Sequence, residues 1–282
     1  MPVSAVRLTL SSLLLALAGC AAVPEPRAAT AEVGPAKAVG YLAQDAVPDS
    51  LALLPAPPAE DSAAFALDRV VMQQALALHD SARFRQAGAD VELGFPAGAN
   101  QFACTLGLDV TEKATPHLYR LLERSRIDVS ASTRAAKDRY RRPRPFLVNQ
   151  APTCSPAEEA HLRTSGSYPS GHSAVGWAWA LILGEIDPAH ADALAVRGRN
   201  YGESRLVCNV HWSSDVVEGR MLGAAVVARL HDNPGFGEDL DGARRELQHA
   251  RRDQARRDPA SLRSRDCASE AATLSIRPKD AQ

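Results

Sequence analysis

The stretch Ser167-Tyr168-Pro169-Ser170-Gly171-His172-Ser173 is followed directly by an apolar run from Ala174 to Ile186. Ser170 is a typical helix N-cap residue, and the run after it suits a buried helix. Gly171 lets the backbone approach a ligand closely, and the unpaired N–H groups of a helix N-terminus favour an anion such as phosphate. The stretch therefore predicts a buried helix whose first turn carries His172 at an anion site. A capped helix with a surface histidine is the alternative.

The rest of the domain also favours helices. Ala, Leu, Arg and Glu dominate, and no stretch shows sustained alternation with β-branched residues. Asn233-Pro234-Gly235 is expected to stop a helix. One all-α helical-bundle domain with a sizeable core is therefore expected. Caps, prolines and apolar periodicity predict helices over residues 62–86, 116–130, 132–140, 172–186, 189–203, 215–231 and 240–254.

The first 19 residues have the pattern of a secretory signal peptide, with Arg7 followed by an apolar segment from Leu8 to Ala18. Leu17-Ala18-Gly19-Cys20 resembles a bacterial lipobox, which implies cleavage before Cys20 and lipidation of that cysteine. Ordinary cleavage near Ala18 is the alternative. No other stretch has the roughly 18 uninterrupted apolar residues that a spanning helix needs. We therefore expect a periplasmic protein that touches the outer membrane only through a lipid anchor.

Composition divides the remaining chain into segments. Residues 20–40 are expected to form a flexible tether, residues 41–254 the domain, and residues 255–282 a polar tail. The domain is expected to begin with an extended arm, because Leu51, Leu53 and Leu54 would otherwise be exposed. The formal net charge is −1 and acidic residues interrupt the Arg-rich C-terminal region, so no nucleic-acid partner is expected.

Two further stretches carry charged residues at fixed spacing. Lys137 is followed by six residues and then Arg144-Pro145. Ser204-Arg205 is followed by five residues, His211, three residues and Asp215. Taken singly, they could be a solvated basic run and a surface pair one helical turn apart.

Together and in this order, the three stretches match the signature Lys-x6-Arg-Pro, Pro-Ser-Gly-His, Ser-Arg-x5-His-x3-Asp. This is the signature of the superfamily that holds acid phosphatases, type 2 phosphatidate phosphatases and vanadium haloperoxidases. Asp49 to Pro55, Gly166 to His172 and Gly202 to Asp215 further resemble the bacterial class A non-specific acid phosphatases. The resemblance covers about residues 41–250. It implies a helical bundle of the acid phosphatase/vanadium haloperoxidase type, a small-molecule phosphate monoester as substrate and a homo-oligomer.

The residue types suit phosphoryl transfer, which needs cations and N–H donors on the phosphoryl oxygens, a nucleophile and an acid for the leaving oxygen. Lys137, Arg144 and Arg205 would supply positive charge. Ser170 and the Gly171 N–H would add donors at the helix N-terminus. No metal or other cofactor is expected, because the three basic side chains neutralise the phosphate.

The two motif histidines are expected to have different roles. His211 would be the nucleophile, because a carboxylate at the spacing of Asp215 fixes the imidazole tautomer and stabilises its developing charge. His172 would protonate the leaving alcohol, which predicts an acid pH optimum. The family resemblance implies the same roles, with a phosphohistidine at His211. The remaining histidines have no such carboxylate and are expected to be structural or exposed: His79, His117, His161, His190, His231 and His249.

The sequence therefore predicts a broad-specificity, metal-independent acid phosphatase with possible transfer of phosphate to alcohols. Two alternatives stay open. One is a vanadate-dependent haloperoxidase, because vanadate mimics phosphate in such a site. The other is a lipoprotein that binds phosphate without catalysis.

Four cysteines lie beyond Cys20. In an oxidising compartment they favour disulfides, and three pairings are possible. The resemblance to class A phosphatases implies a Cys154–Cys208 pair, which leaves Cys104 and Cys267 as the second.

Overall fold

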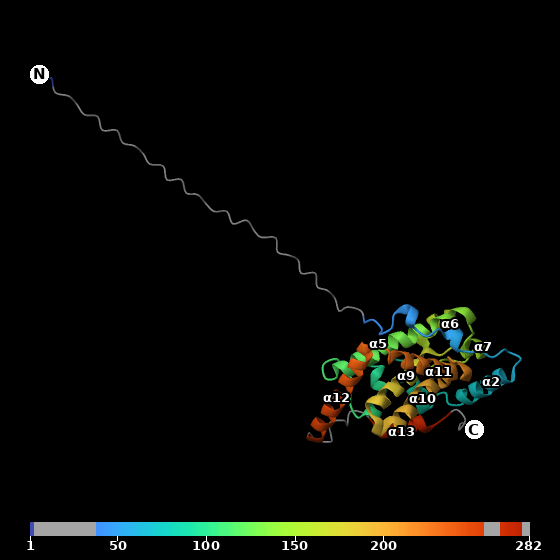
Figure 1. Ribbon diagram of the computed structural model, residues 1–282. Helices are drawn as coiled ribbons and strands as arrows, with labels where there is room; N and C mark the ends of the chain where they lie inside the picture. The colour runs from blue at the N-terminus through green and yellow to red at the C-terminus, as the bar shows by residue number, and fades with distance from the viewer. Residues whose placement is uncertain (3–37, 257–265, 278–282) are drawn as a thin grey trace. The chain divides into compact units, whose positions relative to one another are not determined.

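The computed structural model describes residues 1–2, 38–256 and 266–277. The predicted signal peptide, the lipidation site at Cys20 and most of the tether lie outside these ranges. From Ala38 onward the described residues form one compact unit. Every regular element in that unit is a helix (Figure 1), which confirms the all-α prediction.

The helices follow one another through short connections. The α-helices are α1 (Ser50–Leu53), α2 (Ala63–Leu76), α3 (Ala82–Ala89), α4 (Ala103–Leu106), α5 (Pro116–Ser132), α6 (Arg134–Tyr140), α7 (Pro145–Asn149), α8 (Glu159–Thr164), α9 (Gly171–Ile186), α10 (Ala191–Val207), α11 (Ser213–Leu230), α12 (Pro234–Arg256) and α13 (Cys267–Ser275). The short 3₁₀ helices are η1 (Gln44–Ala46), η2 (Ala99–Phe102), η3 (Pro156–Glu158) and η4 (Pro188–His190).

The central helix of the domain is α9, which packs against α5, α10, α11 and α12 (Figure 1). Apolar side chains cover most of its circumference, as expected for a helix inside the core. Trp179 is completely buried among aromatic rings, and its indole N–H donates to the Leu122 carbonyl at 3.0 Å. Its N-terminus is therefore held in a fixed place at one end of the bundle.

Glycines let α10 and α11 approach α9 closely. A Cβ on Gly198 of α10 would lie 2.8 Å from the carbonyl oxygen of Gly176. A Cβ on Gly223 of α11 would lie 2.4 Å from the carbonyl oxygen of Ala174. Both approaches are too tight for any side chain. They bring the C-terminal end of α10 and the N-terminal end of α11 to the N-terminus of α9.

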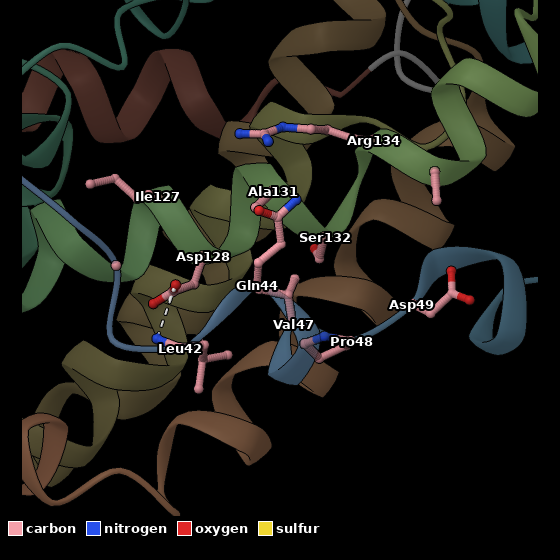
Figure 2. A pocket seen from close by; sticks show the side chains of 12 residues that line it. Leu42, Gln44, Val47, Pro48, Asp49, Ile127, Asp128, Ala131, Ser132 and Arg134 are labelled. Carbon is pink, nitrogen blue, oxygen red and sulfur yellow. Dashed lines mark hydrogen bonds between the residues drawn. The ribbon is translucent and has the colours of Figure 1, made fainter.

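The N-terminal arm lies on α5, as Figure 2 shows. The Asp128 carboxylate accepts the N–H groups of Tyr41 at 2.7 Å and Leu42 at 3.3 Å. Of the three leucines expected to be covered, only Leu54 is buried, whereas Leu51 and Leu53 are 42% and 50% exposed. Because η1 and α1 form within the arm, it is also not extended throughout.

Two predicted helix boundaries were wrong. The helix expected over 62–86 is two helices, because Asp80 has a φ of 63° and Ser81 caps a new helix. Pro234 was expected to stop a helix, but it begins α12, where Asn233 Oδ1 accepts the N–H of Phe236 at 3.2 Å. Proline is tolerated in a first turn, since the N–H it lacks has no partner there.

The segment predicted to be a polar tail contains α13, which packs against α3. No helix in the described part of the chain is both long and apolar enough to cross a membrane.

Candidate active site

The three sequence motifs meet at the N-terminus of α9. Lys137 comes from α6, Arg205 from the last turn of α10, and Asp215 from the first turn of α11. The Ser170 N–H donates to the Asp215 carbonyl at 2.9 Å, which joins the start of α9 to the start of α11. All the predicted site residues thus gather at one end of the bundle.

His211 is 4% exposed and lies between Asp215 and Arg144. Its Nδ1 is 3.3 Å from Asp215 Oδ2, and its Nε2 is 3.1 Å from Arg144 Nη1. A guanidinium can only donate, so this contact requires an unprotonated Nε2 and places the imidazole proton on Nδ1. Burial, followed by the charges of Arg144, Lys137 and Arg205, holds the pKa of His211 well below 6.5. The ring is therefore neutral, with its lone pair on Nε2.

Asp215 is completely buried and is held from two sides. Its Oδ2 accepts the Trp212 N–H at 2.9 Å, and its Oδ1 accepts Arg142 Nη1 at 2.6 Å. Burial raises the pKa of Asp215, and these two donors oppose that rise. His211 precedes α11, so the pair spans the start of the helix and does not lie on one helical face.

Behind Asp215 lies a network that the sequence did not reveal. Asp68 on α2 accepts Arg142 Nη2 at 2.7 Å, and its other oxygen accepts the Ser214 N–H at 2.7 Å. Arg142 and Asp68 are 7% and 2% exposed. Arg142 stands at a variable position of the first motif, and Asp68 lies more than seventy residues upstream of it, so no spacing rule points to either.

The Arg144 side chain is fully occupied by the protein itself. Its Nε donates to the carbonyls of Leu162 at 3.0 Å and Ser165 at 3.1 Å, and Nη1 donates to the carbonyl of Val210 at 3.0 Å. Burial and the nearby charge of Arg205 lower its pKa to about 10, so it stays cationic near neutrality. Arg144 therefore braces the loops around His211 while adding positive charge.

Arg205 differs from Arg144 in its free donors. It is 1% exposed, yet its Nε and Nη1 have no hydrogen-bond partner among the described residues. Burial lowers its pKa to about 10. A buried guanidinium with unsatisfied donors is costly unless an anion completes its hydrogen bonds. The orphaned donors of Arg205 thus fit a bound phosphate.

Lys137 is the third cation of the cluster. Its Nζ donates to the Gly166 carbonyl at 2.9 Å. Burial, and then the charge of Arg144, lower its pKa to about 7. Its charge is therefore present in acid solution and is lost as the pH rises above neutrality.

Ser170 caps α9 as predicted. Its Oγ accepts the N–H of Ser173 at 3.3 Å and the hydroxyl of Ser173 at 2.8 Å. The Ser170 O–H proton is still available for a ligand. A Cβ on Gly171 would meet no protein atom within 4 Å, so space is open beside the first turn of the helix.

His172 is held by a backbone carbonyl. Its Nε2 is 2.8 Å from the oxygen of Val91, and its ring stacks on Tyr201 with the centroids 6.4 Å apart. Burial, and then the charge of Arg205, hold the pKa of His172 well below 6.5. Neither Val91 nor Tyr201 belongs to a motif, so sequence reasoning missed both.

Both expected disulfides are present. Cys154–Cys208 ties the loop before α8 to the end of α10, between Arg205 and His211. Cys104–Cys267 ties α4 to α13.

Some of the remaining histidines have carboxylate partners after all. His117 Nδ1 is 2.9 Å from Asp239, and His190 Nδ1 is 2.9 Å from Asp187. Both pairs lie outside the motif cluster. In the described ranges no three His, Cys, Asp or Glu side chains are grouped as a metal site would require.

Comparison with known proteins agrees with this arrangement. Residues 127–234 match the PAP2 superfamily. The chain is 40% identical over 208 residues to a non-specific acid phosphatase of Providencia stuartii, a match that covers 73% of this chain and 84% of the relative. It is 38% identical over 195 residues to a non-specific acid phosphatase of Salmonella typhimurium (69% and 78% covered). It is 36% identical over 203 residues to an acid phosphatase of Zymomonas mobilis (72% and 77% covered). With its three motifs brought to one site and these similarities along most of its length, the chain belongs to the PAP2 superfamily.

Proposed function

We propose that the protein is an acid phosphatase that hydrolyses a broad range of phosphate monoesters through a phosphohistidine at His211. One observation carries the proposal. The Nε2 lone pair of His211 faces a cluster of buried cations, while Asp215 holds the proton on Nδ1. The names of the relatives support the same activity.

The proposed reaction has two steps. The dianionic phosphoryl group binds between Arg205, Lys137 and the N-terminus of α9. His211 Nε2 attacks phosphorus and forms a P–N bond as the ester P–O bond breaks, while His172 donates a proton to the leaving oxygen. Water then attacks the phosphohistidine, its proton passes to His172, and inorganic phosphate leaves.

Other acceptors and cofactors follow from this scheme. An alcohol that replaces water in the second step would give phosphate transfer as a side activity. Lys137, Arg144 and Arg205 neutralise the developing charge, so we propose that no metal is needed.

The acid optimum follows from His172. Its pKa lies well below 6.5, so in the free enzyme the imidazolium forms only in acid solution. Lowering the pH therefore raises the fraction with a proton to donate, and the negative charge of bound phosphate raises that fraction further. His211, whose pKa is also low, stays neutral and nucleophilic under the same conditions. A rate profile that is flat between about pH 5 and pH 9 would count against this role for His172.

The test is hydrolysis of p-nitrophenyl phosphate in the presence of EDTA, with ³²P-labelled phosphate ester used in parallel to trap the intermediate. We expect full activity with EDTA and an acid-labile labelled protein. His211→Ala should lose both. His231→Ala is the matched control, because this exposed histidine pairs with Glu185 away from the site. Persisting activity in His211→Ala would overturn the nucleophile, and loss of activity with EDTA would overturn metal independence.

Export and the oligomeric state stay predictions. Labelling with a radioactive fatty acid tests the lipid anchor, and a wild type that labels no better than Cys20→Ser would contradict it. Light scattering of the purified protein tests the homo-oligomer.

A further inference from the structure

The segment 90–92, which connects α3 to the rest of the chain, lies against the general-acid histidine. Its middle residue, Val91, offers its carbonyl oxygen to His172 Nε2 at 2.8 Å. A carbonyl oxygen can only accept a hydrogen bond, so Nε2 must carry the proton. This leaves Nδ1 as the ring nitrogen that can exchange a proton with substrate.

The residues on either side of Val91 are anchored to α10. The Asp90 carboxylate is completely buried and accepts Arg197 Nη2 at 2.6 Å and Ser204 Oγ at 2.5 Å. The Glu92 carbonyl accepts the Tyr201 hydroxyl at 2.8 Å. The Val91 carbonyl is therefore fixed from both sides.

The anchors share one face of α10. Arg197, Tyr201 and Ser204 follow one another at helical spacing, and the next residue is Arg205, the cation with free donors. The ring of Tyr201 also stacks on the imidazole of His172. One helix face thus sets the position of the acid and of the phosphate fork together.

We propose that Asp90, Arg197 and Tyr201 are positioning residues that hold the Val91 carbonyl against His172 Nε2, so that Nδ1 is the atom that protonates the leaving oxygen. The inference rests on the proposed function and deepens it. The three residues act through Val91 and need not touch the substrate. A Val91 carbonyl that moved would let the imidazole turn, and a misplaced acid loses much of its rate advantage.

The sharpest variant is Tyr201→Phe, which keeps the ring and removes only the hydroxyl that holds Glu92. The readout is kcat/KM for two substrates, because this constant reports steps up to release of the alcohol. A nitrophenolate leaves with little help from an acid, whereas the alkoxide of glycerol 3-phosphate must be protonated. We expect kcat/KM to fall about tenfold or more for glycerol 3-phosphate and to change less than about twofold for p-nitrophenyl phosphate. An equal fall with both substrates, or no fall with either, would overturn the inference.

Tyr41→Phe is the matched control. It also removes a buried tyrosine hydroxyl, which donates to Asp239 at 2.8 Å, but on the other side of the domain. Both substrates should respond alike in this variant. Asp90→Asn tests the other anchor and should show the same preference for the nitrophenyl ester as Tyr201→Phe.

Two measurements separate this inference from the proposed function. His172→Ala should show the full dependence on the leaving group; if it shows none, the acid role itself fails. ¹⁵N NMR of the wild type reports the tautomer of His172 and needs no variant for the state itself, only His172→Gln for assignment. A proton on Nε2 at neutral pH supports the inference, and a proton on Nδ1 overturns it even if the phosphatase mechanism stands.

Discussion

The two catalytic histidines are held by two different kinds of support. His211 contacts a full negative charge, the Asp215 carboxylate, which Arg142 and Asp68 hold from behind. His172 contacts only the dipole of the Val91 carbonyl, although a buried carboxylate lies one residue away.

The difference matches the chemistry proposed for each ring. A nucleophile becomes positively charged when it attacks, and a carboxylate stabilises that charge. An acid must give its proton away, and a neutral carbonyl orients the ring without binding the proton so tightly. The surroundings of the two rings therefore distinguish their roles more clearly than their burial does, since burial lowers both pKa values.

The largest expected effect comes from neutralising the carboxylate beside His211. Asp215→Asn should lower kcat by about 10²- to 10⁴-fold, because the amide cannot hold the correct tautomer or stabilise the imidazolium. The loss should be equal for aryl and alkyl esters, since the nucleophile serves both. Steady-state kinetics with the two ester classes checks this. A loss confined to alkyl esters would exchange the roles of the two histidines.

Removing the more distant carboxylate tests whether the support extends behind Asp215. Asp68→Asn leaves Arg142 and the Ser214 N–H with a weaker partner. We expect a fall in kcat of about tenfold and a stability loss of about 1–3 kcal/mol. Chemical denaturation and kinetics measure the two effects. The fall should again be independent of the leaving group, in contrast to Asp90→Asn beside His172, and a shared preference would remove the distinction between the two supports.

The cation between the two regions should impose a pH dependence of its own. The pKa of Lys137 is about 7, so its charge is lost as the pH rises through that value and phosphate binding weakens. In a plot of log kcat/KM against pH, the wild type should steepen above about pH 7. Lys137→Arg stays charged and should lack this steeper limb, although its activity is lower at acid pH. The exposed Lys113→Arg is the control and should keep the wild-type profile; identical profiles for wild type and Lys137→Arg would contradict the assignment.

The smallest effect is expected at the helix start that both regions share. A Cβ at Gly171 meets no protein atom, so Gly171→Ala should fold normally and raise KM a few-fold by intruding on the bound phosphate. Gly184→Ala lies in the same helix, and its Cβ makes ordinary contact with Ala191 at 3.5 Å. Both should gain stability of up to about 1 kcal/mol from helix propensity. Thermal denaturation and KM separate the variants, and an unchanged KM in Gly171→Ala would place the phosphate elsewhere.

Much of the molecule could be read from the sequence because the signals are local. The cap at Ser170, the apolar run after it and the prolines at helix starts depend only on neighbouring residues, so most helices were predicted. The motif residues could be assigned to one site because the chemistry of phosphate transfer demands those residue types in combination.

The tertiary structure decided everything that depends on contacts between distant segments. Asp68 reaches Arg142 from α2, and Val91 reaches His172 from the end of α3, and neither residue stands at a revealing spacing. It also showed that Arg144 is spent on loop carbonyls while Arg205 keeps free donors, although the two look alike in sequence. Local propensity and residue chemistry therefore determined the helices and the catalytic set. Only packing, which places buried donors and acceptors against one another, decided how each member of that set is held.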